Sequence, residues 1–124
     1  MSTILIVEDN EKNMKLARDV LQSKGYATLE AVTGEDGVRL AKERKPDLVL
    51  MDIQLPGMNG IDALAQLRAD AATAKIPVVA FTASVTPTDR SQINQAGFDG
   101  FLGKPINLKE FLETVQRLCA AGRA

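Results

Sequence analysis

The sequence predicts an α/β protein whose core is a doubly wound, five-stranded parallel sheet. Three short runs are almost continuously apolar, as strands buried on both faces of a parallel sheet are. Segments with helical spacing of apolar residues follow the strand candidates, so the order is strand then helix throughout the chain. The expected strands are Ile4–Val7, Ala27–Ala31, Leu48–Met51, Pro77–Phe81 and Gly100–Leu102, in the sheet order 2-1-3-4-5.

Five helices are expected to alternate with these strands. The first covers Glu11–Lys24 and ends at Gly25, a residue type that suits the C′ position. Thr33, with Asp36 three residues later, predicts the N-terminus of the second helix. The other three are indicated by caps and apolar stripes. Their signals are Ile61, Leu64 and Leu67 for the third, Thr86, Pro87 and Asp89 for the fourth, and Asn107, Leu108, Glu110, Phe111, Leu112, Val115 and Leu118 for the fifth.

Length and composition limit the classes of protein. With 124 residues, 45% of them hydrophobic, the chain is predicted to form one domain over residues 1–124, with no separate output domain. A net charge of −1 gives no reason to expect a nucleic-acid or membrane partner. Cys119 is the only cysteine and histidine is absent, which excludes a disulfide framework and a Cys/His metal cage. The first residues do not have the pattern of a signal peptide, so a cytoplasmic location is expected.

Polar residues follow the expected strands at the edge where their carboxyl ends meet. In an open parallel sheet, ligands bind at this edge, near the point where the strand order reverses. Three of the residues are carboxylates, and their mutual repulsion favours a bound cation. Oxygen ligands suit a hard cation such as Mg²⁺, with Mn²⁺ and Ca²⁺ left open. The residues are Glu8 and Asp9 after the first strand, Asp52 after the third, Thr82 after the fourth and Lys104 after the fifth.

The same residues favour an anion bound over the metal. Lys104 offers a positive charge with donors only, and the Thr82 hydroxyl can donate to an anion's oxygen. A carboxylate can also act as a nucleophile and form an acyl phosphate. Metal and lysine would then neutralise the phosphoryl group during its transfer. The pattern therefore predicts a site for an anion that binds over a metal ion.

Four motifs resemble the response-regulator receiver domains of bacterial two-component systems. They are "ILIVEDN", "PDLVLMDIQLPGMNG", "IPVVAFTA" and "FLGKPI", and in this order they span almost the whole chain. The segments around the first and second motifs resemble single-domain cell-cycle regulators and also receiver domains of hybrid kinases. The resemblance implies a receiver-type, flavodoxin-like fold. It also implies a signalling protein and not an enzyme, with at most slow self-catalysed phosphotransfer and dephosphorylation.

The resemblance also implies roles for individual residues. Asp52 would be the phosphoacceptor, and Glu8, Asp9, Asp52 and the backbone carbonyl of Gln54 would hold Mg²⁺. Lys104 would pair with the phosphoryl group and would precede a cis peptide bond to proline.

A histidine kinase or a histidine phosphotransfer protein would supply the phosphoryl group. After phosphorylation, Thr82 would move toward the phosphoryl group and Phe101 would rotate inward as the switch. Gln54 and Ser84 would line the approach of the hydrolytic water. The downstream partner would read the face formed by the fourth helix, the fifth strand and the fifth helix.

Other functions fit the sequence less well. Haloacid dehalogenase-type phosphatases carry Asp-x-Asp after the first strand, where this chain has Glu8-Asp9-Asn10. Toprim domains need a second acid where this chain has Gln54. A flavodoxin-like cofactor binder would need a phosphate-binding loop where two carboxylates stand. An interaction domain with a relic site, independent of phosphorylation, is the remaining alternative.

Overall fold

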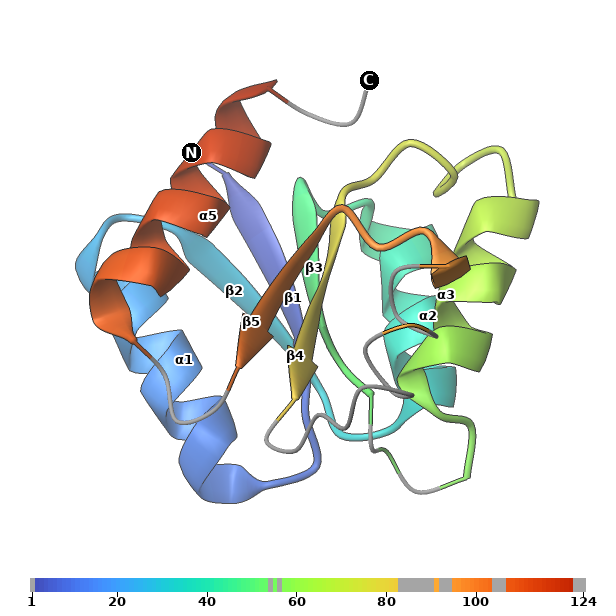
Figure 1. Ribbon diagram of the computed structural model, residues 1–124, viewed down its shortest axis with the longest axis horizontal. Coiled ribbons are helices and arrows are strands. Elements are labelled where there is room, and N and C mark those ends of the chain that lie inside the picture. The colour runs from blue at the N-terminus through green and yellow to red at the C-terminus, as the bar shows by residue number, and fades with distance from the viewer. Residues whose placement is uncertain are drawn as a thin grey trace.

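The structure, a computed structural model, describes residues 2–53, 55, 57–82, 91, 95–103 and 107–121. One sheet of five parallel strands has the order β2-β1-β3-β4-β5, with helices on both of its faces (Figure 1). The predicted fold class and strand order are therefore confirmed. The strands are β1 (Thr3–Val7), β2 (Ala27–Ala31), β3 (Leu48–Asp52), β4 (Val78–Thr82) and β5 (Gly100–Gly103), and the helices are α1 (Glu11–Ser23), α2 (Gly34–Arg44), α3 (Gly60–Ala69) and α5 (Leu108–Ala121).

The fourth expected helix falls mostly outside the described residues. Ser91, Gln95 and Ala96 are helical, and Gly97 follows them with a φ of 96°. The signals that predicted its start, Thr86, Pro87 and Asp89, are not among the described residues. This helix therefore stays a prediction, and the last helix keeps the label α5.

The two faces of the sheet bury two separate apolar cores. Along β1, Ile4 and Ile6 pack with α1 and α5, whereas Leu5 and Val7 pack with α2 and α3. Figure 1 shows the same division, with α1 and α5 over one face and α2 and α3 over the other. All of β3 is buried, as expected for the central strand of such a sheet. Among the described helices, none has the length and apolar character needed to cross a membrane.

The helix termini follow the predicted capping signals. The Thr33 side chain accepts a hydrogen bond from the Asp36 amide over 3.1 Å, which caps α2. The Asn107 side chain accepts from the Glu110 amide over the same distance. Gly25, with a φ of 87°, follows the last turn of α1, a conformation that other residues adopt only at a cost.

Three local details differ from the sequence-based expectation. Asp52 is the last residue of β3 and not the first residue of the following loop. Leu108 is 53% exposed because it lies in the first turn of α5, at the end of the apolar stripe. In α3 the buried face is formed by Gly60, Ala63, Leu64 and Leu67, so Ile61 lies at its border and is only half-buried.

Candidate metal and phosphoacceptor site

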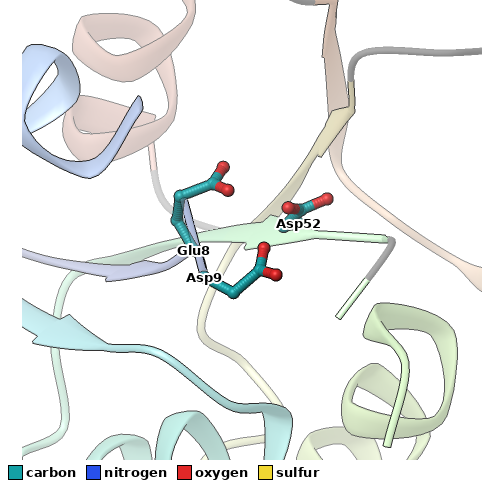
Figure 2. Close-up of side chains that lie close together, drawn as sticks. All are labelled: Glu8, Asp9 and Asp52. Carbon is teal, nitrogen blue, oxygen red and sulfur yellow. The ribbon is translucent and has the colours of Figure 1, made fainter. Parts of the chain in front are cut away.

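Three carboxylates meet at the carboxyl edge of the two central strands. Glu8 and Asp9 directly follow β1, and Asp52 ends β3. The two strands are neighbours, with Val7 paired to Met51, so residues 8 and 52 leave the sheet side by side. A carboxylate oxygen of each residue lies within 4.8 Å of those of the other two (Figure 2). The acidic cluster predicted from the sequence is therefore present in the fold.

Burial makes this cluster unlike a group of surface acids. Only 1% of Glu8 and 4% of Asp52 is exposed, whereas Asp9 is open to solvent. Carboxylates are rarely buried unless a partner compensates their charge. A small, hard cation bound by oxygen ligands meets this need, and Mg²⁺ commonly uses a few carboxylates together with waters. The donor set therefore fits a divalent cation.

The turn after β1 holds Glu8 in place. The Glu8 amide donates to the Ala31 carbonyl at the end of β2 over 2.9 Å. The Glu8 Oε1 atom accepts from the Asn10 amide over 3.1 Å, and the Asn10 side chain in turn caps α1 by accepting from Asn13. Asn10 therefore caps α1, while the neighbouring Asp9 is exposed at the cluster.

The loop that follows Asp52 returns very close to the strand it leaves. The Gly60 amide donates to the Ile53 carbonyl over 3.1 Å, at the start of α3. A Cβ atom at position 60 would lie 2.3 Å from the Asp52 carbonyl oxygen, a distance that real Cβ atoms do not show. Only glycine allows this close return, which fixes the base of the loop directly beside the acidic cluster.

The other predicted site residues are placed only in part. Thr82 ends β4 opposite Gly103 and directly follows Phe81, which pairs with Asp52. The backbone of Thr82 therefore lies at the same edge, while its side chain is outside the described part. Lys104 follows β5 in sequence. Lys104, Gln54 and Ser84 lie outside the described residues.

Phe101, the predicted switch residue, lies in β5 opposite Ala80 and is half-buried. It occupies the strand at the edge of the sheet, separated from β3 by β4 alone. Its ring is therefore neither fully enclosed by the core nor fully exposed to solvent.

A cleft of about 390 Å³ borders the acidic cluster on the side of α1 and β2. Glu8 and Asp9 form one wall, and Lys15, Arg18 and Val32 are among the other lining residues. Both signs of charge are present, with Arg18 paired to Glu30 over 3.3 Å.

Sequence reasoning missed one residue next to the site, Glu35 in the first turn of α2. Its Oε1 atom accepts from the amide of Met58, in the loop between β3 and α3, over 3.2 Å. The topology offered one signal. The helix after β2 begins at the same edge of the sheet as the acidic cluster, so residues in its first turn can lie near the cluster. No sequence pattern indicates which loop Glu35 contacts.

The fold and the acidic cluster together define a doubly wound α/β protein with three carboxylates at its switch point, in an arrangement that could hold a metal ion. A family model, the response regulator receiver domain, matches residues 4–116. The chain belongs to this family, whose members are signalling proteins of two-component systems and receive phosphoryl groups from histidine kinases.

Curated relatives support the single-domain type of response regulator. The polar-differentiation response regulator DivK of Brucella anthropi is 42% identical over 114 residues, which cover 92% of this chain and 93% of that protein. DivK of Brucella ovis has the same identity and coverage. The chain is thus homologous to single-domain response regulators that act in phosphorelay signalling.

Solved structures agree with this family in fold. The receiver domain of a sensor histidine kinase from Pseudomonas aeruginosa, described with a magnesium ion in its active-site cleft, superposes with a TM-score of 0.91. It is 33% identical, and the match covers 97% of this chain and 98% of that one. The chemotaxis protein CheY4 of Vibrio cholerae is 26% identical, with a TM-score of 0.87 and coverage of 94% and 98%.

Proposed function

We propose that this protein is a single-domain response regulator, with its receiver domain in residues 1–124, that accepts a phosphoryl group on Asp52 in the cytoplasm. The donor is the phosphohistidine of a histidine kinase or of a histidine phosphotransfer protein. The observation that supports this most strongly is the cluster of buried Glu8 and Asp52 with exposed Asp9, whose carboxylate oxygens lie within 4.8 Å of one another, in a chain of the receiver family.

Glu8, Asp9, Asp52 and the backbone carbonyl of Gln54 would hold Mg²⁺, and Mn²⁺ would fit the same ligands. When bound there, the metal would supply positive charge that offsets the negative charge of the phosphoryl group. Asp9 is the exposed member of the cluster, so its carboxylate lies where an incoming cation first meets the site. Glu8 and Asp52 are buried, so their geometry is fixed before the cation arrives.

In the transfer step, an Asp52 carboxylate oxygen attacks the phosphorus atom of the phosphohistidine. The new O–P bond gives an acyl phosphate, the N–P bond breaks, and the imidazole nitrogen keeps the electron pair and takes up a proton. Lys104 pairs with the oxygens of the phosphoryl group, and the Thr82 hydroxyl donates a hydrogen bond to one of them. Gln54 and Ser84 line the path of the water that later hydrolyses the acyl phosphate slowly.

The output of this step would be a change in protein contacts. Thr82 moves toward the phosphoryl group, and Phe101 in the neighbouring strand turns inward to fill the space. The face formed by the fourth helix, β5 and α5 then changes its shape for a partner protein. Neither a nucleic acid nor a membrane is proposed as a partner, because the net charge is only −1.

The test is phosphorylation of the purified protein, followed by intact-mass spectrometry. Wild type should gain one phosphoryl group from acetyl phosphate with Mg²⁺, and none when the metal is chelated. Asp52→Asn should gain none. Asp62→Asn, the same change at an exposed carboxylate in the first turn of α3, should behave as wild type. A folded wild-type protein that gains no group from acetyl phosphate or from a phosphorylated histidine phosphotransfer protein would favour the interaction domain with a relic site.

A further inference from the structure

The loop between Asp52 and α3 is held from a second side, by the N-terminus of α2. We propose that Glu35 is a positioning residue that fixes this loop and thereby sets how tightly a divalent cation binds at Asp52. This inference rests on the proposed function, because the loop matters only if the acidic cluster binds a metal. Glu35 touches neither the metal nor the phosphoryl group and acts through the backbone of the loop.

The base of the loop is fixed at position 60, where the chain returns against Asp52. The hydrogen bond from the Gly60 amide to Ile53 closes the loop, and the Asn59 side chain caps α3 by accepting from Asp62 over 2.9 Å. These contacts fix the two ends of the loop. Met58, between these two ends, has a further contact that comes from α2.

The far side of the loop rests on the first turn of α2. The Glu35 carboxylate accepts from the Met58 amide over 3.2 Å, across 23 residues of sequence. Gly34 lies so close that a Cβ atom there would approach the Met58 carbonyl oxygen to 2.6 Å. Gly57, with a φ of 72°, turns the chain so that the Met58 amide faces α2. The α2 terminus therefore contacts both the amide and the carbonyl of Met58.

Ile53 and Met58 are thus held by two supports, Gly60 at the start of α3 and Glu35 on α2. Gln54, which follows Ile53 in sequence, supplies one of the proposed metal ligands through its backbone carbonyl. Residues that orient a metal ligand typically change metal affinity by about 10- to 100-fold when they are lost. Glu35 is exposed and its hydrogen bond is open to water. We therefore expect a smaller effect, with Mg²⁺ affinity falling by about three- to tenfold.

A simpler role for Glu35 is that of an acid in the first turn of a helix, where it would stabilise α2 through the helix dipole. Substitution of Asp36 distinguishes the role in the helix dipole from the role in positioning the loop. Asp36 lies in the same turn and carries the same charge, but it pairs with Arg39 over 3.5 Å on the helix itself. Loss of the Asp36 carboxylate removes the dipole contribution and leaves the Met58 contact intact.

The test compares Glu35→Ala, Glu35→Gln and Asp36→Ala with wild type by NMR. Exchange of the Met58 amide reports the hydrogen bond directly, and titration with Mg²⁺ gives the dissociation constant. Glu35→Ala should expose the Met58 amide to faster exchange and weaken Mg²⁺ binding by the stated factor. Glu35→Gln keeps an acceptor oxygen, so its Met58 exchange rate and its Mg²⁺ dissociation constant should be close to those of wild type. Asp36→Ala should change neither the exchange rate nor the dissociation constant. Gly34→Ala should weaken Mg²⁺ binding as well, because its methyl group would displace the loop.

Two results would overturn the proposal. The first is an unchanged Mg²⁺ dissociation constant in Glu35→Ala while Met58 exchange is faster, which would show that the loop position does not set affinity. The second is an equal loss of affinity in Glu35→Ala and Asp36→Ala, which would assign the effect to the helix terminus. Failure of the wild-type protein to bind Mg²⁺ would instead overturn the proposed function, and this inference with it.

Discussion

Arg68 and Asp99 form an ion pair that ties the end of α3 to the start of β5. The Nη2 and Oδ2 atoms are 2.8 Å apart, and the side chains are only 18% and 17% exposed. Arg68 also donates to the Ile76 carbonyl, and Asp99 accepts from the Val78 amide at the start of β4. One carboxylate thus joins three segments at the edge of the sheet opposite the acidic cluster.

Removal of Asp99 is expected to destabilise the whole domain. In Asp99→Ala, the Arg68 charge loses its partner in a mostly buried position, and the Val78 amide loses an acceptor. We expect the free energy of unfolding to fall by about 2–4 kcal/mol, measured by urea denaturation. The control is Lys42→Ala, which breaks the exposed Lys42–Asp70 pair of 3.6 Å and should cost less than about 1 kcal/mol. Equal losses in the two variants would contradict the role given to burial.

Gly60→Ala should disturb the acidic cluster through the backbone. The added methyl group would meet the Asp52 carbonyl oxygen at 2.3 Å, so β3 and the loop must separate. We expect a loss of about 1–3 kcal/mol in the free energy of unfolding, together with weaker Mg²⁺ binding. Gly103→Ala is the matched control, because no described atom lies within 4 Å of its added methyl group. Calorimetry with and without Mg²⁺ measures both effects, and a normal Gly60→Ala protein would refute the close packing.

Asp9→Asn should stabilise the metal-free protein and make it insensitive to Mg²⁺. Two like charges about 5 Å apart repel by about 1 kcal/mol even in water, and this variant removes one of three such charges. Wild type should gain about 2.7 kcal/mol when Mg²⁺ is present at 100 times its dissociation constant, whereas the variant should gain little. Denaturant titrations with and without Mg²⁺ test this. The control is Asp19→Asn, outside the cluster, which should be stabilised by Mg²⁺ as much as wild type is. If Mg²⁺ stabilised Asp9→Asn as much as wild type, Asp9 would not be a metal ligand.

Alkaline pH is expected to destabilise the fold through Cys119 and Tyr26. Burial, followed by the nearby Asp47 carboxylate, raises the pKa of the Cys119 thiol, although a hydrogen bond from Ser2 acts in the opposite direction. Burial and the Cys119 charge also raise the pKa of Tyr26. Because the unfolded state loses these protons first, the free energy of unfolding should fall as the pH rises from about 8.5 through 10.

Cys119→Ser removes the thiol and part of the charge that acts on Tyr26. The free energy of unfolding of this variant should therefore fall less steeply with pH than that of wild type. Urea denaturation at a series of pH values gives both curves. Parallel curves for wild type and Cys119→Ser would exclude a contribution from the thiol.

Much of the fold and the acidic cluster was predictable because each depends on short-range sequence signals. Continuous apolar runs identified the strands, and the edge at which parallel strands end brought Glu8, Asp9 and Asp52 together. The contacts of Arg68 with Asp99 and of Glu35 with Met58 were not predictable, since they join residues 31 and 23 positions apart without a periodic signal. Leu108 was expected in the apolar stripe of the fifth helix but is exposed, because an apolar pattern does not reveal where a helix stops being covered.

The strand order also divides the chain into two functional halves. All three carboxylates of the acidic cluster come from the first 52 residues, and the strands that would respond, β4 and β5, come from later in the chain. The ladder of backbone hydrogen bonds between β3 and β4 joins these two parts in the sheet, and Asp52 pairs with Phe81 there. Neighbouring strands are about 4.8 Å apart, so a chemical change on Asp52 has only this distance to cross. Such a short signalling path would let the edge of the sheet respond while both apolar cores keep their packing.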